Sequence, residues 1–181
     1  MTSTNPVSPL HRTVDALRLA LVGSPDLFCF FGGTLEEGTA ITAEADGVPR
    51  GFVDFCRVLD GVSCSTSLQL FGLEQAQNHQ SFCQPVVGSL LPLSPEKLYC
   101  IGMINDTPVY LDRADGGVLA TPERQGEWAE ADSLEQLADG LEAFFLEQVA
   151  TSEYVLLARI DDEMSKFDDW PKLLRRAGLT G

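Results

Sequence analysis

The chain has 181 residues, the size of one ordinary domain, and 44% of them are hydrophobic, which is enough for a buried core. Acids dominate its charge: 27 Asp and Glu stand against 12 Lys and Arg, a formal net charge of −15. Nucleic-acid-binding surfaces need Lys and Arg to neutralise phosphates, and anionic membranes attract the same cations, so this balance argues against both. It favours either solubility alone or a basic partner.

The sequence predicts neither a membrane span nor a secretory leader. No apolar run approaches the ~18–20 residues that a span needs. Residues 1–9, MTSTNPVSP, lack the charged-then-apolar pattern of a signal peptide. The five cysteines are odd in number, form no CxxC motif and mostly lie among apolar neighbours, where a thiol behaves as a small hydrophobe. We therefore expect a cytoplasmic protein.

The first predicted element is a helix over residues 9–22. Ser8 suits the N-cap position, and the proline that follows it suits the first helical position. Apolar residues then recur at helical spacing until Gly23-Ser24-Pro25 ends the helix. The short aromatic run Leu27–Phe31 predicts a buried strand.

Two helices and a strand are predicted next. The first helix covers Thr39–Asp46, and the second covers about Pro49–Leu59, with one apolar stripe along it. Leu68–Phe71 has the composition of a strand. Residues 72–86 are polar, and their pattern leaves open an exposed loop or a short helix.

The segment 98–120 predicts three antiparallel strands. The apolar run Leu98–Ile104 is followed by Asn105-Asp106, which favours a tight turn. Val109–Leu111 forms the second strand, and the glycines after Asp115 supply a second turn before a third strand. Both faces of the first strand are apolar or small, so we expect it to be central or covered on both sides.

The last third of the chain is predicted to be helical. Ser133 and Gln136 form a capping box that opens an amphipathic helix reaching past Phe145, which we expect to lie on the sheet. The apolar run 154–160 is too short for its periodicity to distinguish strand from helix. Residues 168–178 predict a final helix with basic residues near its C-terminal end and a glycine cap.

Sequence motifs for catalysis or cofactor binding are absent. There is no GxxxxGK[ST], GxGxxG, HExxH or GxSxG pattern. His11 is predicted to be solvated, and His79 lies in the polar segment, four residues before Cys83. A metal site of Cys64, His79 and Cys83 matches no usual zinc spacing, and a Cys–His nucleophile pair is equally weakly supported. We expect core cysteines, a surface histidine, no metal and no cofactor.

Two stretches combine acidic residues with a nearby tryptophan. Clustered acids most often form a solvated face, although they also suit a basic protein partner or a divalent metal. We favour the partner, because the second stretch lacks the glycine and terminal glutamate of a calcium loop. A tryptophan would anchor such an interface, with core burial as the equal alternative for Trp128 and Trp170. The candidate contacts are Glu127, Trp128, Glu130 and Asp132, followed by Asp161, Asp162, Glu163, Asp168 and Asp169.

Several segments resemble the SMI1/KNR4, or SUKH, superfamily. VPRGFVDFCRVLDG (48–61) resembles its LP…F…NG helix, and LQLFGLE (68–74) its following strand and sLEe motif. YCIGMINDTPVYLDRADGGV (99–118) is similar to its central hairpin, and Ser133–Phe145 to its closing helix. The resemblance covers about 41–150. The chain departs from the family pattern at three places: Asp60-Gly61 replaces Asn-Gly, a polar insert covers 72–96, and an extension follows residue 150.

The resemblance implies an α+β fold, in which helices pack around an antiparallel β-sheet. The chain would be one SMI1/KNR4-like domain over 1–181, with an N-terminal helix at 9–22 and a C-terminal extension at 151–181. The resemblance also implies binding rather than catalysis. Bacterial members are typically immunity proteins that neutralise toxins, often nucleases, of polymorphic toxin systems, and fungal members are interaction hubs. The family motifs are fold-forming, so no binding residue carries over by position.

Charge and resemblance together predict a non-enzymatic bacterial immunity protein. Nucleases present cationic surfaces, which an acidic inhibitor finds by electrostatic steering. One alternative is a regulatory scaffold of the same fold without a toxin partner. Another, from a different class, is a hydrolase using Cys64 or Cys83 with His79.

Overall fold

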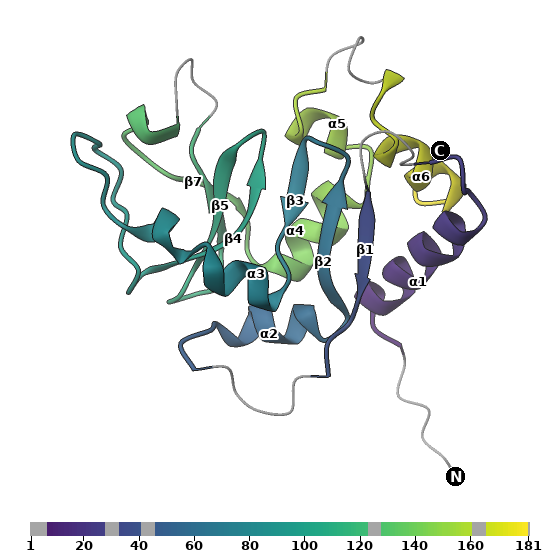
Figure 1. The fold of residues 1–181 in the computed structure, drawn as a ribbon, viewed down its shortest axis with the longest axis horizontal. Coiled ribbons are helices and arrows are strands. Elements are labelled where there is room, and N and C mark those ends of the chain that lie inside the picture. Colours follow the sequence, from purple (N-terminus) through teal and green to yellow (C-terminus); the bar gives the residue numbers. More distant parts are fainter. Residues whose placement is uncertain (1–6, 28–32, 41–45, 123–127, 161–165, 181) are drawn as a thin grey trace.

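A computed structural model describes residues 7–27, 33–40, 46–122, 128–160 and 166–180. Seven antiparallel strands form one open sheet in which the spatial order is the chain order, β1 to β7. The predicted α+β fold is therefore confirmed (Figure 1). The strands are β1 (Thr34–Glu37), β2 (Leu59–Cys64), β3 (Leu68–Leu70), β4 (Leu98–Ile104), β5 (Thr107–Asp112), β6 (Val118–Ala120) and β7 (Glu135–Ala138).

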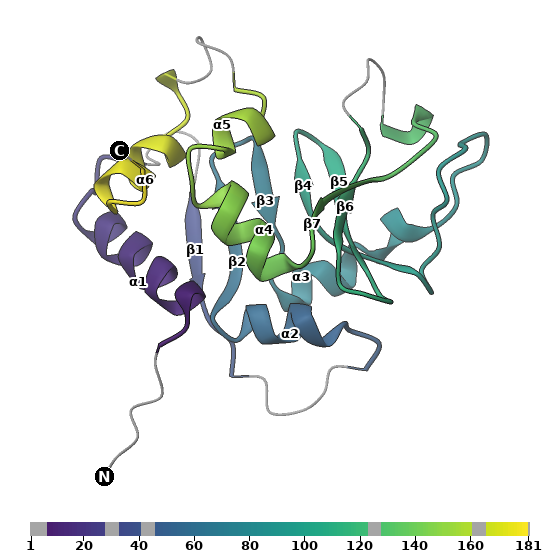
Figure 2. The same cartoon turned by 180° about the vertical axis from the view of Figure 1, so that it is seen from behind.

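Helices lie on both faces of the sheet and beside its β1 edge. Figures 1 and 2 place α3 and α4 on opposite faces of the sheet, while α1 and α6 lie side by side next to β1. The helices are α1 (Pro9–Val22), α2 (Arg50–Cys56), α3 (Leu73–Asn78), α4 (Leu141–Phe144), α5 (Tyr154–Leu157) and α6 (Trp170–Arg176). Three further turns of helix are η1 (Gln80–Cys83), η2 (Trp128–Glu130) and the π-helical η3 (Phe145–Val149). Among the described residues no helix is both long and apolar enough to cross a membrane.

The core is aromatic and joins the helices to the sheet. Phe55 of α2 meets Phe145 of η3 edge-on, with ring centroids 5.6 Å apart. Trp170 of α6 is fully buried, and its indole N–H donates to the Val149 carbonyl at 2.8 Å. The extension after residue 150 is thus part of the same core rather than a loose tail.

The predicted meander is confirmed as β4, β5 and β6. Asn105 and Asp106 both have positive φ, 45° and 63°, as a two-residue hairpin turn requires. Gly102 lies in β4 opposite Leu70 of β3. A Cβ at residue 102 would lie 2.2 Å from the Gln69 carbonyl oxygen, so this close strand approach needs glycine.

Other local predictions are confirmed, one of them with shorter bounds. The helix over 9–22 matches α1, and the Ser8 hydroxyl accepts its predicted capping bond from the His11 N–H. α2 ends at Cys56, three residues before the predicted end, because Leu59 already belongs to β2. The open segments 72–86 and 154–160 contain short helices. Most of Leu27–Phe31 and of Thr39–Asp46 lies outside the described residues.

The predicted helix from Ser133 through Phe145 is wrong in its first half. Residues 135–138 form β7, which pairs with β6, and the helix begins only at Leu141. The Ser133 hydroxyl donates to the Asp132 carboxylate instead of capping a helix. Gly140 has an extended backbone, which separates the strand from the helix. The open edge of β6 gives 135–138 a partner that helical spacing alone cannot reveal.

Candidate functional site

The structure divides the predicted acidic residues of the C-terminal stretch. Asp168 is only 4% exposed, and its carboxylate accepts from the Tyr154 hydroxyl and from the Trp170 N–H, each at 2.8 Å. Burial raises the pKa of this carboxyl group. Asp168 therefore belongs to the core, and its predicted place on a partner-binding surface is wrong. Trp170 is core as well, which leaves Trp128 as the available anchor.

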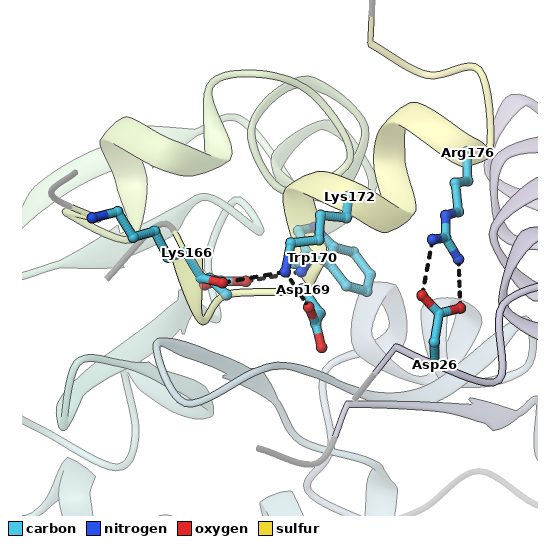
Figure 3. Close-up of polar contacts among 7 residues, drawn as sticks. Asp26, Lys166, Asp169, Trp170, Lys172 and Arg176 are labelled. Carbon is cyan, nitrogen blue, oxygen red and sulfur yellow. Dashed lines mark hydrogen bonds and ion pairs between the residues drawn. The ribbon is translucent and has the colours of Figure 1, made fainter. Parts of the chain in front are cut away.

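Asp169 is largely neutralised by its own helix. Its carboxylate lies 2.7 Å from the ammonium group of Lys172, which also donates to the Lys166 carbonyl (Figure 3). In the same figure the Arg176 guanidinium forms two bonds with the Asp26 carboxylate, at 2.9 and 3.0 Å. This contact lowers the pKa of Asp26. The other three predicted acids of this stretch, Asp161, Asp162 and Glu163, lie outside the described residues.

The first predicted stretch remains at the surface. Trp128 begins η2 and is half-buried, and its ring meets Phe82 edge-on at 6.0 Å. Glu130 and Asp132 are exposed beside it, and Glu127 lies outside the described residues. An aromatic ring held by a second ring with carboxylates nearby is a suitable contact for a basic partner.

Trp128 ends a row of four rings, called here the aromatic row: Phe71, His79, Phe82 and Trp128. The Phe71 and His79 centroids are 4.6 Å apart, and His79 stacks on Phe82 at 6.2 Å with an interplanar angle of 11°. Phe71 is buried, whereas the other three rings are half-buried. The row therefore links the core to the surface around Trp128. The polar composition of 72–86 gave no sign of this role for Phe82.

A pocket of about 480 Å³, called here the acidic pocket, lies where α3 meets β1, β2 and β3. His79 lines it, so the aromatic row borders the pocket. Three carboxylates line it, and the described residues place no Lys or Arg in its wall. These carboxylates are Glu36, Asp60 and Glu74; the uncharged polar lining is Thr34, Gln69, Gln75 and Asn78.

The three carboxylates of the acidic pocket differ in whether they already have partners within the protein. Asp60 is structural, because it accepts from the Leu73 N–H at 2.7 Å, at the start of α3, and from the Thr39 hydroxyl. Glu36 and Glu74 are exposed, and within the described chain neither side chain forms an ion pair. These two charges are therefore free to meet an external cation.

The pocket does not assemble a cysteine nucleophile. The His79 ring is held by a bond from Nδ1–H to the Gln75 carbonyl at 2.7 Å, while the Cys83 thiol donates to Gln80 Oε1 at 3.5 Å. Burial raises the pKa of the Cys64 and Cys83 thiols, whereas a nucleophilic cysteine needs a lowered pKa. In the part of the chain that the structure describes, no three His, Cys, Asp or Glu side chains group as metal ligands.

The site thus offers carboxylates, amides and aromatic rings for recognition. No protein-family model, no curated protein and no solved structure matches this chain. Any functional assignment consequently depends on the residues of the site, on the charge of the chain and on the sequence resemblance described above.

Proposed function

We propose that this protein is a non-enzymatic binding domain of SMI1/KNR4 type, acting as a bacterial immunity protein that neutralises a nuclease-type toxin of a polymorphic toxin system. The observation that supports this proposal most is the acidic pocket, which has three carboxylates and no cation in its described wall. The aromatic row leads from this pocket to Trp128 and its exposed acids. Together they offer a basic protein both charge and an aromatic anchor.

Electrostatics favour a cationic partner over other ligands. A net charge of −15 repels nucleic acid and attracts basic proteins over the range of a Debye length, about 8 Å at physiological salt. Glu36 and Glu74 supply local charge that no described residue compensates. An Arg or Lys of the partner would gain a charge-assisted hydrogen bond there without displacing an internal one.

The same contacts explain inhibition of a nuclease. A nuclease holds its substrate with Lys and Arg side chains directed at phosphates. A protein that covers these cations with carboxylates competes directly with the nucleic acid. Inhibition then needs no catalysis by the inhibitor. This agrees with the raised pKa values of the Cys64 and Cys83 thiols and with the His79 ring, whose Nδ1–H already donates to the Gln75 carbonyl.

The test is titration of the protein into a panel of basic nuclease domains from polymorphic toxins, followed by calorimetry and by nuclease activity. We expect one or more domains to bind and to lose activity. The double variant Glu36→Gln/Glu74→Gln should weaken this binding about tenfold, at ~0.7 kcal/mol for each exposed charge. The exposed Glu153 lies outside the pocket, so Glu153→Gln serves as the control and should change affinity less than threefold.

The outcomes separate the alternatives. Binding without loss of nuclease activity favours the regulatory scaffold. Hydrolysis that disappears in His79→Ala favours the enzyme. Absence of binding across the panel, or an affinity unaffected by the double variant, contradicts the proposal.

A further inference from the structure

A second concave surface lies at the end of the sheet where four separate segments of the chain meet. It is a groove of about 660 Å³, called here the α2–α4 groove. Its walls come from the start of α1, from α2, from the β5–β6 turn and from the first turn of α4. Figure 2 shows α2 and the first turn of α4 close together at the lower end of the molecule, with the start of α1 to one side.

The floor of the groove is apolar. Four buried side chains line it, one each from α1, α2, the end of β5 and the start of α4: Leu10, Phe55, Leu111 and Leu141. These side chains also belong to the core, so the floor is rigid and needs no rearrangement to accept a ligand. An apolar floor favours a peptide ligand with an apolar side chain over a free metal ion or other small ion.

The rim of the groove is acidic. Five carboxylates and two guanidinium groups line it, so its formal charge is −5 + 2 = −3. The carboxylates are those of Asp54, Asp112, Asp115, Asp139 and Glu142.

The two arginines of the groove have different environments. The exposed Arg50 lies with its Nε 3.7 Å from the carboxylate of Asp54, which also pairs with Arg57. Arg113 donates to the carbonyls of Pro95, Leu98 and Gly47 and lies over the Tyr99 ring, 5.0 Å from its centroid.

The remaining carboxylates have no cationic partner among the described residues. Asp112 and Asp115 accept only backbone N–H bonds within their turn, from Ala114 and Gly117. Asp139 accepts from the Gln136 amide, and the exposed Glu142 side chain has no donor within the ranges that the structure describes. The groove thus offers four carboxylates without a described ion-pair partner around an apolar floor, and with the charge of Arg113 its net formal charge is −3.

We propose that the α2–α4 groove binds a cationic amphipathic segment of the protein partner, with an apolar side chain on the floor and flanking Lys or Arg side chains at the rim. This inference rests on the proposed function, because it gives the basic partner a second contact. Charge complementarity selects this occupant. A second copy of the chain would bring another −15 against the rim, and residues 1–6, MTSTNP, carry no charged side chain to meet it.

The test uses three short synthetic peptides and the full-length protein. The first peptide is an amphipathic Lys/Leu helix, the second replaces every Leu by Ser, and the third replaces every Lys by Glu. Binding is followed by amide chemical shifts and by calorimetry at low salt. We expect the Lys/Leu peptide alone to bind well and to shift the amides of Gly51, Ala114 and Gly140, which line the groove.

A matched pair of double variants tests the location. Asp139→Asn/Glu142→Gln removes two rim charges and should weaken peptide binding about tenfold. Glu147→Gln/Glu153→Gln removes the same charge from two exposed residues outside the groove and should change it less than threefold. Equal effects of the two pairs would mean that only net charge matters and would overturn the inference.

Other occupants give distinct results. If deletion of residues 2–6 raises peptide affinity about tenfold, the N-terminal segment occupies the groove and the inference is wrong. Sedimentation showing a dimer that dissociates in the rim variant identifies a second copy as the occupant. Toxin inhibition measured on the same variants separates the two proposals. Inhibition that persists without any groove binding contradicts the groove alone, whereas groove binding without any toxin partner contradicts the proposed function alone.

Discussion

Asp168 offers the sharpest test of the core. Its buried carboxylate accepts from the Tyr154 hydroxyl and the Trp170 N–H, and the Tyr154 oxygen lies 2.9 Å from the Cys64 carbonyl oxygen. In Asp168→Ala the hydroxyl retains the carbonyl as acceptor, whereas the Trp170 N–H loses its bond. A hydrogen bond to a charged group contributes about 1.5–3 kcal/mol, so we expect a loss of about 2–3 kcal/mol in the free energy of unfolding. For a domain of this size the melting temperature then falls by about 5–10 °C.

Asp168→Asn separates the charge of this side chain from its shape. The amide can accept from the Trp170 N–H and donate to the Tyr154 oxygen, which in turn donates to Cys64, so we expect a cost below about 1.5 kcal/mol. Burial raises the pKa of Asp168 above its ordinary value of 3.8, so the folded state binds the proton more tightly than the unfolded state. The stability that Asp168 contributes is therefore fully present below about pH 3.8 and is lost as pH rises through the raised pKa. Relative to Asp168→Asn, the native protein should lose stability over that window.

The assay is urea unfolding of the native chain and both variants at several pH values between 4 and 8, followed by tryptophan fluorescence. Fully buried Trp170 contributes to the signal. A pH-independent difference between the native chain and Asp168→Asn would refute the reasoning about burial. A cost below about 0.5 kcal/mol for Asp168→Ala would refute the reasoning about its hydrogen bonds.

Three further predictions concern packing, the anchor and the thiols. Gly102→Ala should destabilise the protein by about 1–3 kcal/mol in thermal unfolding, because the new methyl meets the Gln69 backbone oxygen, and an unchanged melting temperature would contradict this. Trp128→Ala should cost little stability, because its ring is only half-buried, yet weaken partner binding at least tenfold by calorimetry; unchanged affinity would exclude it as the anchor. In a Cys29→Ser chain, a thiol reagent should label no cysteine until denaturant is added, because the other thiols are buried and burial raises their pKa values. These other thiols are Cys56, Cys64, Cys83 and Cys100. Rapid labelling of the folded Cys29→Ser protein would contradict this prediction.

The sequence predicted those parts of the fold that local chemistry determines. The β4–β5 turn follows from Asn105 and Asp106, which tolerate positive φ, and α1 follows from its cap and apolar spacing. The segment after Ser133 shows the limit of such reasoning. Its spacing suits a helix, but the open edge of β6 pairs with residues 135–138, and tertiary pairing overrides a local preference. Asp139-Gly140 was the one local sign of a break.

The acidic pocket and the α2–α4 groove could not be predicted from the sequence either, because both depend on tertiary contacts. Composition predicted an acidic protein, but not which carboxylates are already used within the fold. Asp60 caps α3 from thirteen residues away, and Asp168 is buried between Tyr154 and Trp170. Glu142 keeps its charge exposed in a groove made from segments more than a hundred residues apart. Only the assembled structure distinguishes these cases.

A basic partner would be attracted by the carboxylates that the fold leaves uncompensated. Carboxylates with internal partners, such as Asp26 and Asp169, add little to the field outside the protein, because Arg176 and Lys172 compensate them. Uncompensated charges, among them those at the acidic pocket and at the α2–α4 groove, therefore supply the field that a basic protein meets. That field extends about 10 Å at 0.1 M salt and about 3 Å at 1 M, so added salt should slow association far more than it accelerates dissociation. An association rate constant that stays constant between these two salt concentrations would mean that shape and apolar contacts, rather than charge, bring the partner to this protein.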